Sequence, residues 1–409
     1  MKSYDISKHI VKEAYQRVKA NKGAAGVDKE SLEEFEANLK NNLYKIWNRM
    51  SSGSYFPPPI KAVEIPKKDG GKRILGVPTV ADRVAQMVAK IYFEPQVEPH
   101  FHSDSYGYRP GKSAADALAV TRQRCWKYDW VLEFDIKGLF DNIDHDLLMK
   151  AVRKHTENQW VILYIQRWLK APFQMPDGTE KERTKGLMQG GVISPVLANL
   201  FLHYAFDTWM KRQHSGKPFA RYADDAIAHC RSKEAAQDLL ASLKERLAEC
   251  KLELHPVKTR IVYCKDDTRK GDHPEIAFDF LGYTFRPRKS KTRYGKIRTN
   301  YLPAVSQKAQ KAIHQVIRDW RMHRKSDKSL EELAQMYNPV IRGWINYYGR
   351  FYKTELRKVF NHINQALARW ATKKFKKLRK RPRRATYWLR EIAKRESNLF
   401  AHWQTGVCP

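Results

Sequence analysis

Apolar residues near the amino terminus recur at the spacing of an α-helix. Ile10, Ala14 and Val18 fall four residues apart, so one stripe of a helix is apolar. A second helix is predicted from Ser31, because a glutamate three residues later completes a capping box and an apolar stripe follows. Residues 1–56 are therefore expected to form a helical extension.

The next part of the chain mixes strand patterns with helix patterns. Strands are predicted at residues 61–66, 72–77, 130–136, 219–223, 226–230 and 276–286. Helices are predicted between them at residues 80–97, 160–169 and 234–250, and from the capping residues Ser113 and Ser194. The first two strands are joined by a Gly-rich turn and predict a hairpin with a basic tip.

The pattern changes after residue 286. Residues 289–298 are basic and poor in strand signals, and long helical patterns follow at roughly 305–324, 329–349 and 354–378. We therefore predict a mixed α+β domain over residues 1–286 and a basic helical domain over residues 287–409.

Charge is concentrated in the second of these regions. The 409 residues contain 77 Lys and Arg against 44 Asp and Glu, for a net charge of +33. Residues 287–409 hold 31 of the basic residues and only 7 of the acidic ones, a net of +24. Such a field is typical of a protein that binds a polyanion, and nucleic acid is the commonest one. The alternative is a solvated basic surface without a partner.

The remaining composition narrows the class of protein. Hydrophobic residues make up 42% of the chain, which excludes disordered and collagen-like classes. The five cysteines stand singly, so neither a zinc knuckle nor a disulfide framework is indicated. No signal peptide or apolar run long enough for a membrane span is evident. We expect a cytoplasmic protein with no membrane partner, and no oligomeric state is indicated.

Three aspartates are candidates for chemistry. Asp135 ends an apolar strand, and Asp224-Asp225 lies at the tip of a predicted hairpin. Transfer of a phosphoryl group by two metal ions needs carboxylates that converge from separate elements, and Mg²⁺ prefers oxygen ligands. Each feature alone would more often be ordinary turn or strand-end chemistry. Because adjacent strand residues face opposite sides, Asp224 is favoured over Asp225.

The surroundings of these aspartates decide between the two interpretations. Tyr222-Ala223-Asp224-Asp225 resembles the Tyr-x-Asp-Asp box of reverse transcriptases. Further blocks of the same kind occur in order around residues 65–83, 105–113, 134–145, 189–195, 252–259 and 278–283. Residues 338–348 resemble a maturase, or thumb, segment. Together these blocks resemble the group II intron reverse transcriptase/maturase family, from about residue 10 to the carboxy-terminal helices.

The resemblance implies a fold and an activity. The fold is a right-hand polymerase, with fingers and palm in residues 1–286 and an α-helical thumb or maturase domain in residues 287–409. The activity is RNA-templated DNA synthesis from deoxynucleoside triphosphates with two Mg²⁺ ions, for which Mn²⁺ is a substitute. The implied partners are structured intron RNA, whose splicing the protein assists, and an RNA template with a DNA or RNA primer. One alternative is a free-standing relative in DNA repair or phage defence. Another is a splicing cofactor that only binds RNA. The intact Tyr-x-Asp-Asp box argues against this alternative.

The resemblance also implies roles for individual residues. The metal ligands would be Asp135, Asp224, Asp225 and the carbonyl of Ile136. The nucleotide would be bound by Lys67, Arg73, Ile136, Phe140, Gln189 and Lys258, with Phe140 excluding a 2′-hydroxyl group unless it is a core residue. Primer and template would contact Arg109, Lys112 and the turn Leu281-Gly282-Tyr283.

The densest basic tract is expected to bind RNA phosphates, because like charges at this density repel one another unless they are neutralised. Its candidate residues are Lys373, Lys374, Lys376, Lys377, Arg381, Arg383 and Arg384. Most of the nearby aromatic residues are expected to be helix-packing core rather than base-stacking rings.

Two features depart from the family pattern. Met188 stands where the family usually has proline, which affects the expected geometry of the loop that carries Gln189. The His/Cys-rich endonuclease region of many members is not seen before Pro409, so second-strand DNA cleavage is not expected.

Overall fold

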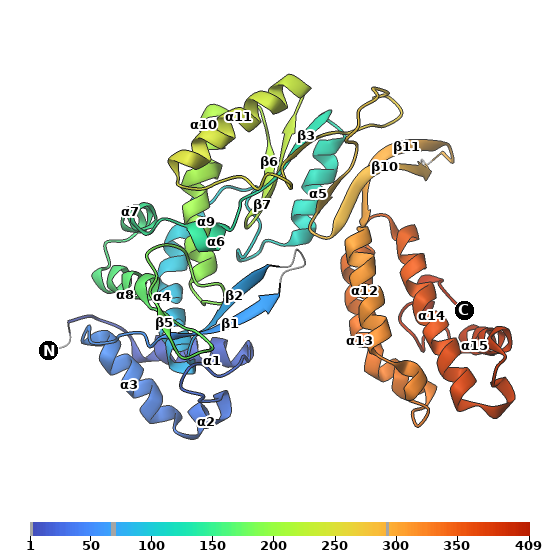
Figure 1. The fold of residues 1–409 in the computed structure, drawn as a ribbon, viewed down its shortest axis with the longest axis horizontal. Helices are drawn as coiled ribbons and strands as arrows, with labels where there is room; N and C mark the ends of the chain where they lie inside the picture. Colours follow the sequence, from blue (N-terminus) through green and yellow to red (C-terminus); the bar gives the residue numbers. More distant parts are fainter. Residues whose placement is uncertain (1–2, 67–70, 292–293) are drawn as a thin grey trace. The chain divides into compact units, whose positions relative to one another are not determined.

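The computed structural model describes residues 3–66, 71–291 and 294–409 of the chain. The helices are α1 (Lys8–Ala20), α2 (Leu32–Ala37), α3 (Leu39–Ser51), α4 (Val80–Val97), α5 (Ala114–Cys125), α6 (Leu139–Asn142), α7 (His145–His155), α8 (Gln159–Lys170), α9 (Ser194–Leu202), α10 (Thr208–Gln213), α11 (Lys233–Glu249), α12 (Gln307–Asp319), α13 (Leu330–Tyr348), α14 (Leu356–Lys374) and α15 (Pro382–Arg395). The strands are β1 (Ile60–Pro66), β2 (Lys72–Val77), β3 (Trp130–Asp135), β4 (Phe173–Gln174), β5 (Glu180–Lys181), β6 (Phe219–Tyr222), β7 (Asp225–Cys230), β8 (Arg260–Tyr263), β9 (Phe278–Phe280), β10 (Tyr283–Lys291) and β11 (Ile297–Val305). The mixture of helices and sheets that the sequence predicts is confirmed (Figure 1).

The chain divides into two compact units. The first consists of Met1–Ala117 and Leu132–Arg260, and the second of Leu118–Val131 and Ile261–Pro409. The boundary predicted near residue 287 falls inside β10, where continuous pairing with β11 holds the chain in one sheet. The division into units therefore does not follow the change in charge along the sequence.

The strands that carry the candidate carboxylates belong to one sheet. Its strand order is β6-β7-β3-β8, so β7 and β3 are neighbours. The first five residues of β3 are buried and only Asp135 at its end is partly exposed. A strand that is buried on both faces is apolar along most of its length. In β3 only Glu133 interrupts the apolar residues before Asp135, so the sequence predicts this strand.

A second sheet carries the predicted basic hairpin. Its order is β2-β1-β4-β5, and β1 pairs with β2 in antiparallel register from Lys61 opposite Val77 to Pro66 opposite Lys72. The tip of this hairpin, with Lys67, lies outside the described residues. The hairpin itself confirms the prediction from the sequence.

The second unit combines a small sheet with helices. Strands lie in the order β11-β10-β9, and α12, α13, α14 and α15 follow (Figure 1). The helices enclose an apolar core that includes Leu333, Ile363 and the fully buried Trp370. Within the described residues no helix combines the length and apolar composition needed to cross a membrane.

The structure corrects the prediction for residues 289–298 and moves the end of one predicted helix. Residues 289–298 are not poor in strand, because β10 extends to Lys291 and β11 begins at Ile297; their charged side chains conceal the alternation. The helix predicted at 354–378 ends at Lys374. Lys380 then adopts a φ of 60°, and Pro382 begins α15, since proline fits the first turn of a helix and not its interior. The basic tract thus spans a break between two helices.

Candidate active site

The three candidate aspartates lie at the ends of adjacent strands in the first unit. Asp135 is the last residue of β3, and Tyr222 pairs with Asp225 across the β6–β7 hairpin. Asp224 is therefore in the two-residue loop and not in a strand. The expectation that strand alternation separates it from Asp225 is wrong, since alternation holds only within a strand.

A lysine lies among these carboxylates. The Nζ atom of Lys258 is 2.7 Å from Oδ2 of Asp135, and this hydrogen bond raises the pKa of Lys258. Asp224 and Asp225 add to the same effect. Burial, and then the nearby charge of Asp135, raise the pKa of Asp224. One cation and three carboxylates therefore share this end of the sheet.

The carboxylate oxygens of this site are of the kind that bind a hard cation. The side chains are nevertheless not arranged as a preformed metal-binding cluster. In the described part of the chain, no three His, Cys, Asp or Glu side chains are placed so that they could hold a metal ion. The Lys258 ammonium group already uses one oxygen of Asp135. Carboxylate oxygens are the ligands that Mg²⁺ prefers, so these side chains fit a divalent ion by their chemistry. Ile136 follows Asp135 and forms an isolated bridge with Leu254.

A buried arginine holds the hairpin in place, and no pattern in the sequence predicts it. The Arg221 side chain is 1% exposed and binds both carboxylate oxygens of the buried Asp207, at 2.7 and 2.6 Å. It also donates to Asn199 Oδ1 and to the carbonyl oxygen of Ala223, each at 3.1 Å. Ala223 itself has a φ of 57°, a region that residues other than glycine rarely adopt. Arg221 therefore fixes the turn that presents Asp224.

The loop before α5 packs against the same hairpin. The Tyr106 amide donates to the Arg221 carbonyl oxygen at 2.8 Å. A Cβ atom on Gly107 would lie 2.5 Å from the Ala223 nitrogen, so only glycine allows this close approach. The loop and the hairpin form one rigid support for the carboxylates.

Two predicted primer-contacting residues in this loop are engaged within the protein. The Arg109 guanidinium group binds Glu98 Oε1 at 2.7 Å and the carbonyl oxygens of His102 and Ser105. Lys112 donates to the Ser103 carbonyl oxygen at 3.0 Å. Arg109 in particular is a structural residue in this arrangement, because its side chain is only 6% exposed.

The predicted nucleotide-binding residues are connected through backbone contacts. The Gly76 amide of β2 donates to the Gln189 carbonyl oxygen at 2.7 Å, and the Leu187 amide donates to the Phe140 carbonyl oxygen at 2.6 Å. Arg73 is exposed on β2, while Phe140 and Gln189 are half-buried. The loop that contains Leu187 and Gln189 is therefore hydrogen-bonded both to β2, which carries Arg73, and to the turn that carries Phe140.

Met188 has a packing role in that loop. Its side chain is buried with Ile60 and Ala171 in a small apolar cluster. The neighbouring Gly190, with a φ of 107°, approaches the Gly76 carbonyl oxygen so closely that a Cβ atom would lie 2.4 Å from it. Although position 188 is methionine and not proline, the carbonyl oxygen of Gln189 is still hydrogen-bonded to Gly76 of β2.

The predicted primer-contacting turn belongs to the second unit. Leu281 and Gly282 both have positive φ, at 49° and 79°, between β9 and β10. Tyr347 of α13 donates its hydroxyl to the Leu281 carbonyl oxygen at 2.8 Å, and the buried Tyr283 donates its own to the Tyr347 carbonyl oxygen. The helix therefore fixes the turn.

The basic tract is mostly exposed, with one exception. The Lys376, Lys377, Arg381, Arg383 and Arg384 side chains are exposed. Lys374 instead donates to the carbonyl oxygens of Ser326 and Lys328, at 3.0 and 2.8 Å. Lys374 is therefore hydrogen-bonded to other residues of the second unit.

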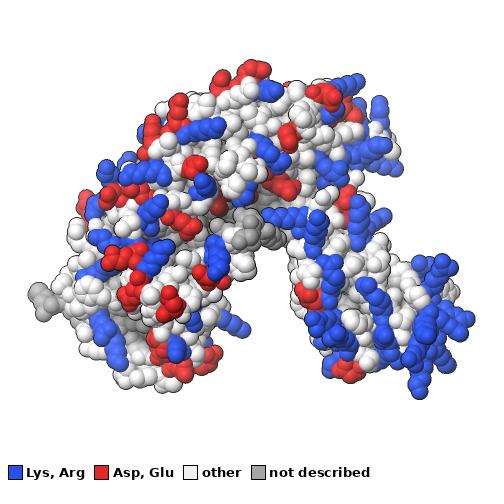
Figure 2. Space-filling view, viewed as in Figure 1, with Lys and Arg blue, Asp and Glu red and all other residues white. Residues whose placement is uncertain are grey.

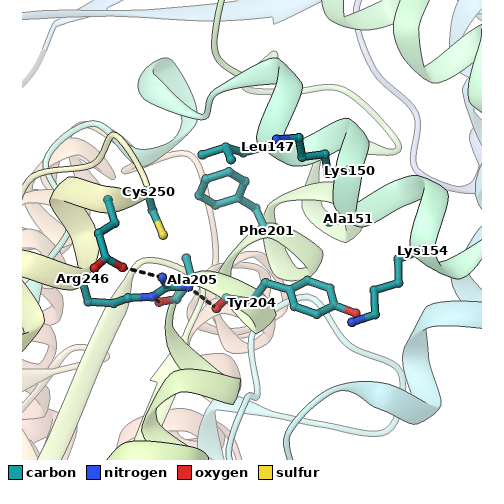
Figure 3. A pocket seen from close by; sticks show the side chains of 10 residues that line it. Leu147, Lys150, Ala151, Lys154, Phe201, Tyr204, Ala205, Arg246 and Cys250 are labelled. Atoms are coloured by element: carbon teal, nitrogen blue, oxygen red, sulfur yellow. Dashed lines mark hydrogen bonds and ion pairs between the residues drawn. The ribbon is translucent and has the colours of Figure 1, made fainter.

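A separate pocket in the first unit contains none of the predicted site residues. It is lined from α7 by Leu147 and Lys154, from the π-helical turn η2 (His203–Asp207) by Tyr204, and from α11 by Arg246 (Figure 3). Arg246 donates to the carbonyl oxygens of Tyr204 and Ala205, at 3.0 and 3.1 Å. The Arg246 guanidinium group therefore binds two carbonyl oxygens of the π-helical turn η2.

Comparisons with known proteins agree with this geometry. A family model described as reverse transcriptase (RNA-dependent DNA polymerase) matches residues 65–285, and one described as the group II intron maturase-specific domain matches residues 310–388. The chain belongs to the group II intron reverse transcriptase/maturase family. As a member it is an RNA-directed DNA polymerase with a polymerase fold and a maturase segment. Family membership implies binding to intron RNA and to nucleic-acid templates, and members use divalent metal ions.

Named relatives are consistent with the reverse transcription and splicing roles of the family. The group II intron-encoded protein LtrA of Lactococcus lactis is 28% identical, over 86% of this chain and 69% of LtrA. Protein YkfC of Escherichia coli is 29% identical, over 70% of this chain and 82% of its own length. A putative COX1/OXI3 intron 1 protein of Saccharomyces cerevisiae is 29% identical over 48% of this chain and 24% of its own. These relatives do not favour the free-standing or non-catalytic alternatives.

Proposed function

We propose that this reverse transcriptase extends a primer on intron RNA by two-metal catalysis at Asp135, Asp224 and Asp225. The observation that carries the proposal is the convergence of these carboxylates on Lys258 at the end of one sheet. Two Mg²⁺ ions, or Mn²⁺ in their place, would be held by the three carboxylates and the Ile136 carbonyl. When bound, they would stabilise the charge that develops on the attacking and leaving oxygens.

The reaction joins the primer to the incoming nucleotide. The 3′-oxygen of the primer forms a bond to the α-phosphorus of the deoxynucleoside triphosphate, pyrophosphate leaves, and the hydroxyl proton passes to solvent. Lys258 pairs with Asp135 before the nucleotide arrives, and its charge offsets the repulsion among the three neighbouring carboxylates. Arg221 keeps the carboxylate of Asp224 oriented through the hairpin.

The surrounding residues would bind the substrates. Arg73 on β2, together with Lys67 in the sequence before this strand, would contact the triphosphate, and Gln189 would contact the nucleotide and template base. Phe140 would exclude a ribose 2′-hydroxyl group, which its half-buried position allows. In the right-hand description, these residues lie in the fingers and palm, and the helices α12–α15 form the thumb or maturase domain.

The primer and the intron RNA would use other residues. The turn Leu281-Gly282-Tyr283 and Lys112 would contact the primer and template, while Arg109 would act indirectly by shaping its loop. Exposed residues of the basic tract would bind phosphates of structured RNA.

A metal-ligand substitution tests the proposal. Asp224→Ala and Asp224→Asn should lower the rate of primer extension on RNA by roughly a hundredfold to a thousandfold, since a metal ion contributes several kcal/mol to the transition state. RNA affinity should stay within a few-fold of the parent, because the substitutions remove little binding area. Asp238→Asn, on the exposed face of α11, is the matched control and should extend normally. Near-parental extension by both Asp224 variants would overturn the metal assignment.

A further inference from the structure

The pocket lined from α7, η2 and α11 contains none of the residues proposed to act in primer extension (Figure 3). All of its lining residues belong to the first unit. Its volume is about 290 Å³, close to the lower end of the range for small-molecule sites, which runs from about 300 to 1,000 Å³. We refer to it as the α7–α11 pocket.

The inner wall of the α7–α11 pocket is apolar. Ala151 of α7, Phe201 of α9 and Ala205 of η2 line it, and their exposed fractions are 9, 4 and 2%. Leu147 is half-buried and lies four residues before Ala151, on the same face of α7. An apolar group that entered the pocket would cover this surface and leave water, which is favourable. The wall therefore suits the apolar part of a ligand.

The side of the pocket formed by η2 is held in place by the protein itself. The Tyr204 hydroxyl and Nε2 of His155 are hydrogen-bonded at 2.6 Å. Arg246 of α11 donates to the carbonyl oxygens of Tyr204 and Ala205. A ligand would meet a preformed wall, and binding to a preformed site costs less ordering of the protein. Single π-helical turns within α-helices are frequent at functional sites.

Positive charge at the rim of the pocket lacks a partner. Lys150 and Lys154 are exposed and lie one turn apart on α7. Over the described ranges, the structure shows no ion pair or side-chain hydrogen bond for either lysine. The Lys154 ammonium group contacts the Tyr204 ring, 4.9 Å from its centroid. Like charges one turn apart destabilise a helix, so an anion bound beside both lysines would be favourable.

The acidic residue of the lining does not cancel this charge. Glu249 accepts a hydrogen bond from Arg246 at 2.7 Å, and its side chain is 66% exposed. Three basic side chains and this one acidic side chain line the pocket, a net charge of +2. On the face shown in Figure 2, the first unit carries Asp and Glu side chains among its Lys and Arg ones. The attraction for an anion is therefore local, on the α7 side of the pocket.

We propose that the α7–α11 pocket binds a small amphipathic carboxylate, with its apolar body against Phe201 and its carboxylate beside Lys150 and Lys154. An inorganic anion would leave the apolar wall in water, and a neutral hydrocarbon would leave both lysines unpaired. A carboxylate with an apolar body satisfies both parts of the pocket. This ligand is neither a nucleotide nor a nucleic acid, so the site goes beyond the proposed function.

Three probes that share one chain length and differ in charge test the site. Octanoate, octan-1-ol and octylammonium would each be titrated into the full chain by isothermal titration calorimetry. We expect octanoate to saturate one site per chain. Octan-1-ol should bind about tenfold more weakly, since it lacks the charge-assisted hydrogen bonds to lysine. Octylammonium should bind more weakly still, because the lysines repel it.

Substitutions separate the two parts of the pocket. Lys150→Gln/Lys154→Gln should weaken octanoate binding by about tenfold and leave octan-1-ol binding unchanged. Ala151→Leu fills part of the pocket and should weaken the binding of both. Arg153→Gln/Lys244→Gln is the matched control, because it removes the same charge from exposed positions on α7 and α11 that do not line the pocket.

Three results would overturn the assignment. They are octanoate binding that does not saturate, parental octanoate affinity in the Lys150/Lys154 variant, and an equal loss in the Arg153/Lys244 control. The last would show that a diffuse field attracts the anion and not the two lysines. Since Gln keeps the helix propensity of α7 and both lysines are exposed, these results decide the matter even if Ala151→Leu fails to fold.

Discussion

Arg221 shows how a single buried charge can set the geometry of a catalytic turn. Its five donors reach Asp207, Asn199, Ser105 and Ala223, which come from four separate parts of the chain. A buried ion pair of this kind adds little to stability compared with apolar packing, but removing one partner leaves the other charge buried and unpaired. The residue therefore acts by positioning Asp224 and not by touching the substrate.

Loss of this arginine should cost stability and activity together. Arg221→Gln should destabilise the first unit by about 3–5 kcal/mol, because Asp207 would remain as an uncompensated buried charge. Denaturant unfolding would measure this. Combining it with Asp207→Asn should recover part of the stability while extension stays slow, since the turn would still lack its support. If the two substitutions simply add, the ion pair is not the reason for the loss.

The Phe140 side chain carries the predicted discrimination between sugars. Phe140→Ala should raise the incorporation of ribonucleotides by about tenfold to a hundredfold, the range that one removed steric contact gives. Competition between a deoxynucleotide and the matching ribonucleotide would measure it. Phe140→Tyr keeps the ring and should discriminate as the parent does. Unchanged discrimination by the Ala variant would show that Phe140 only packs against its neighbours.

At the scale of elements, the break between α14 and α15 changes how the basic tract can act. Lys373 and Lys374 belong to α14, whereas Arg383 and Arg384 belong to α15. Lys374 is used for contacts with Ser326 and Lys328. The tract therefore consists of two short basic helical segments joined by a bend and not of one continuous helix.

Neutralising the exposed members of the tract should weaken RNA binding without unfolding the helices. Changing Lys376, Lys377, Arg383 and Arg384 to Gln should make the salt slope shallower by about 3, at 0.7 to 0.9 per lost contact. A four-charge control, with Lys211, Arg212, Lys233 and Lys244 changed to Gln, uses exposed positions on α10 and α11. Extension of a pre-annealed primer at low salt should survive in both. Equal slopes for the variant and the parent would identify the tract as solvated surface.

At the scale of the whole molecule, features that are local in sequence could be predicted and features that depend on distant segments could not. The β6–β7 hairpin and β3 consist mostly of apolar residues beside acidic ones, so their sequence predicts both structure and chemistry. The contact of Lys258 with Asp135 joins residues 123 positions apart and could be predicted only through the family resemblance. Arg221 carries no such signal, because an arginine in a strand reads as a surface residue.

The two compact units are interleaved along the chain, with Leu118–Val131 inserted into the sequence of the first unit while it packs in the second. Trp126 of this segment donates to the Tyr301 carbonyl oxygen, 175 residues later. During synthesis on the ribosome, the segment must therefore wait for most of its partners, for about 10 to 30 seconds at the usual rates of elongation. Buried side chains such as Leu118 and Cys125 remain without their native cover for that time.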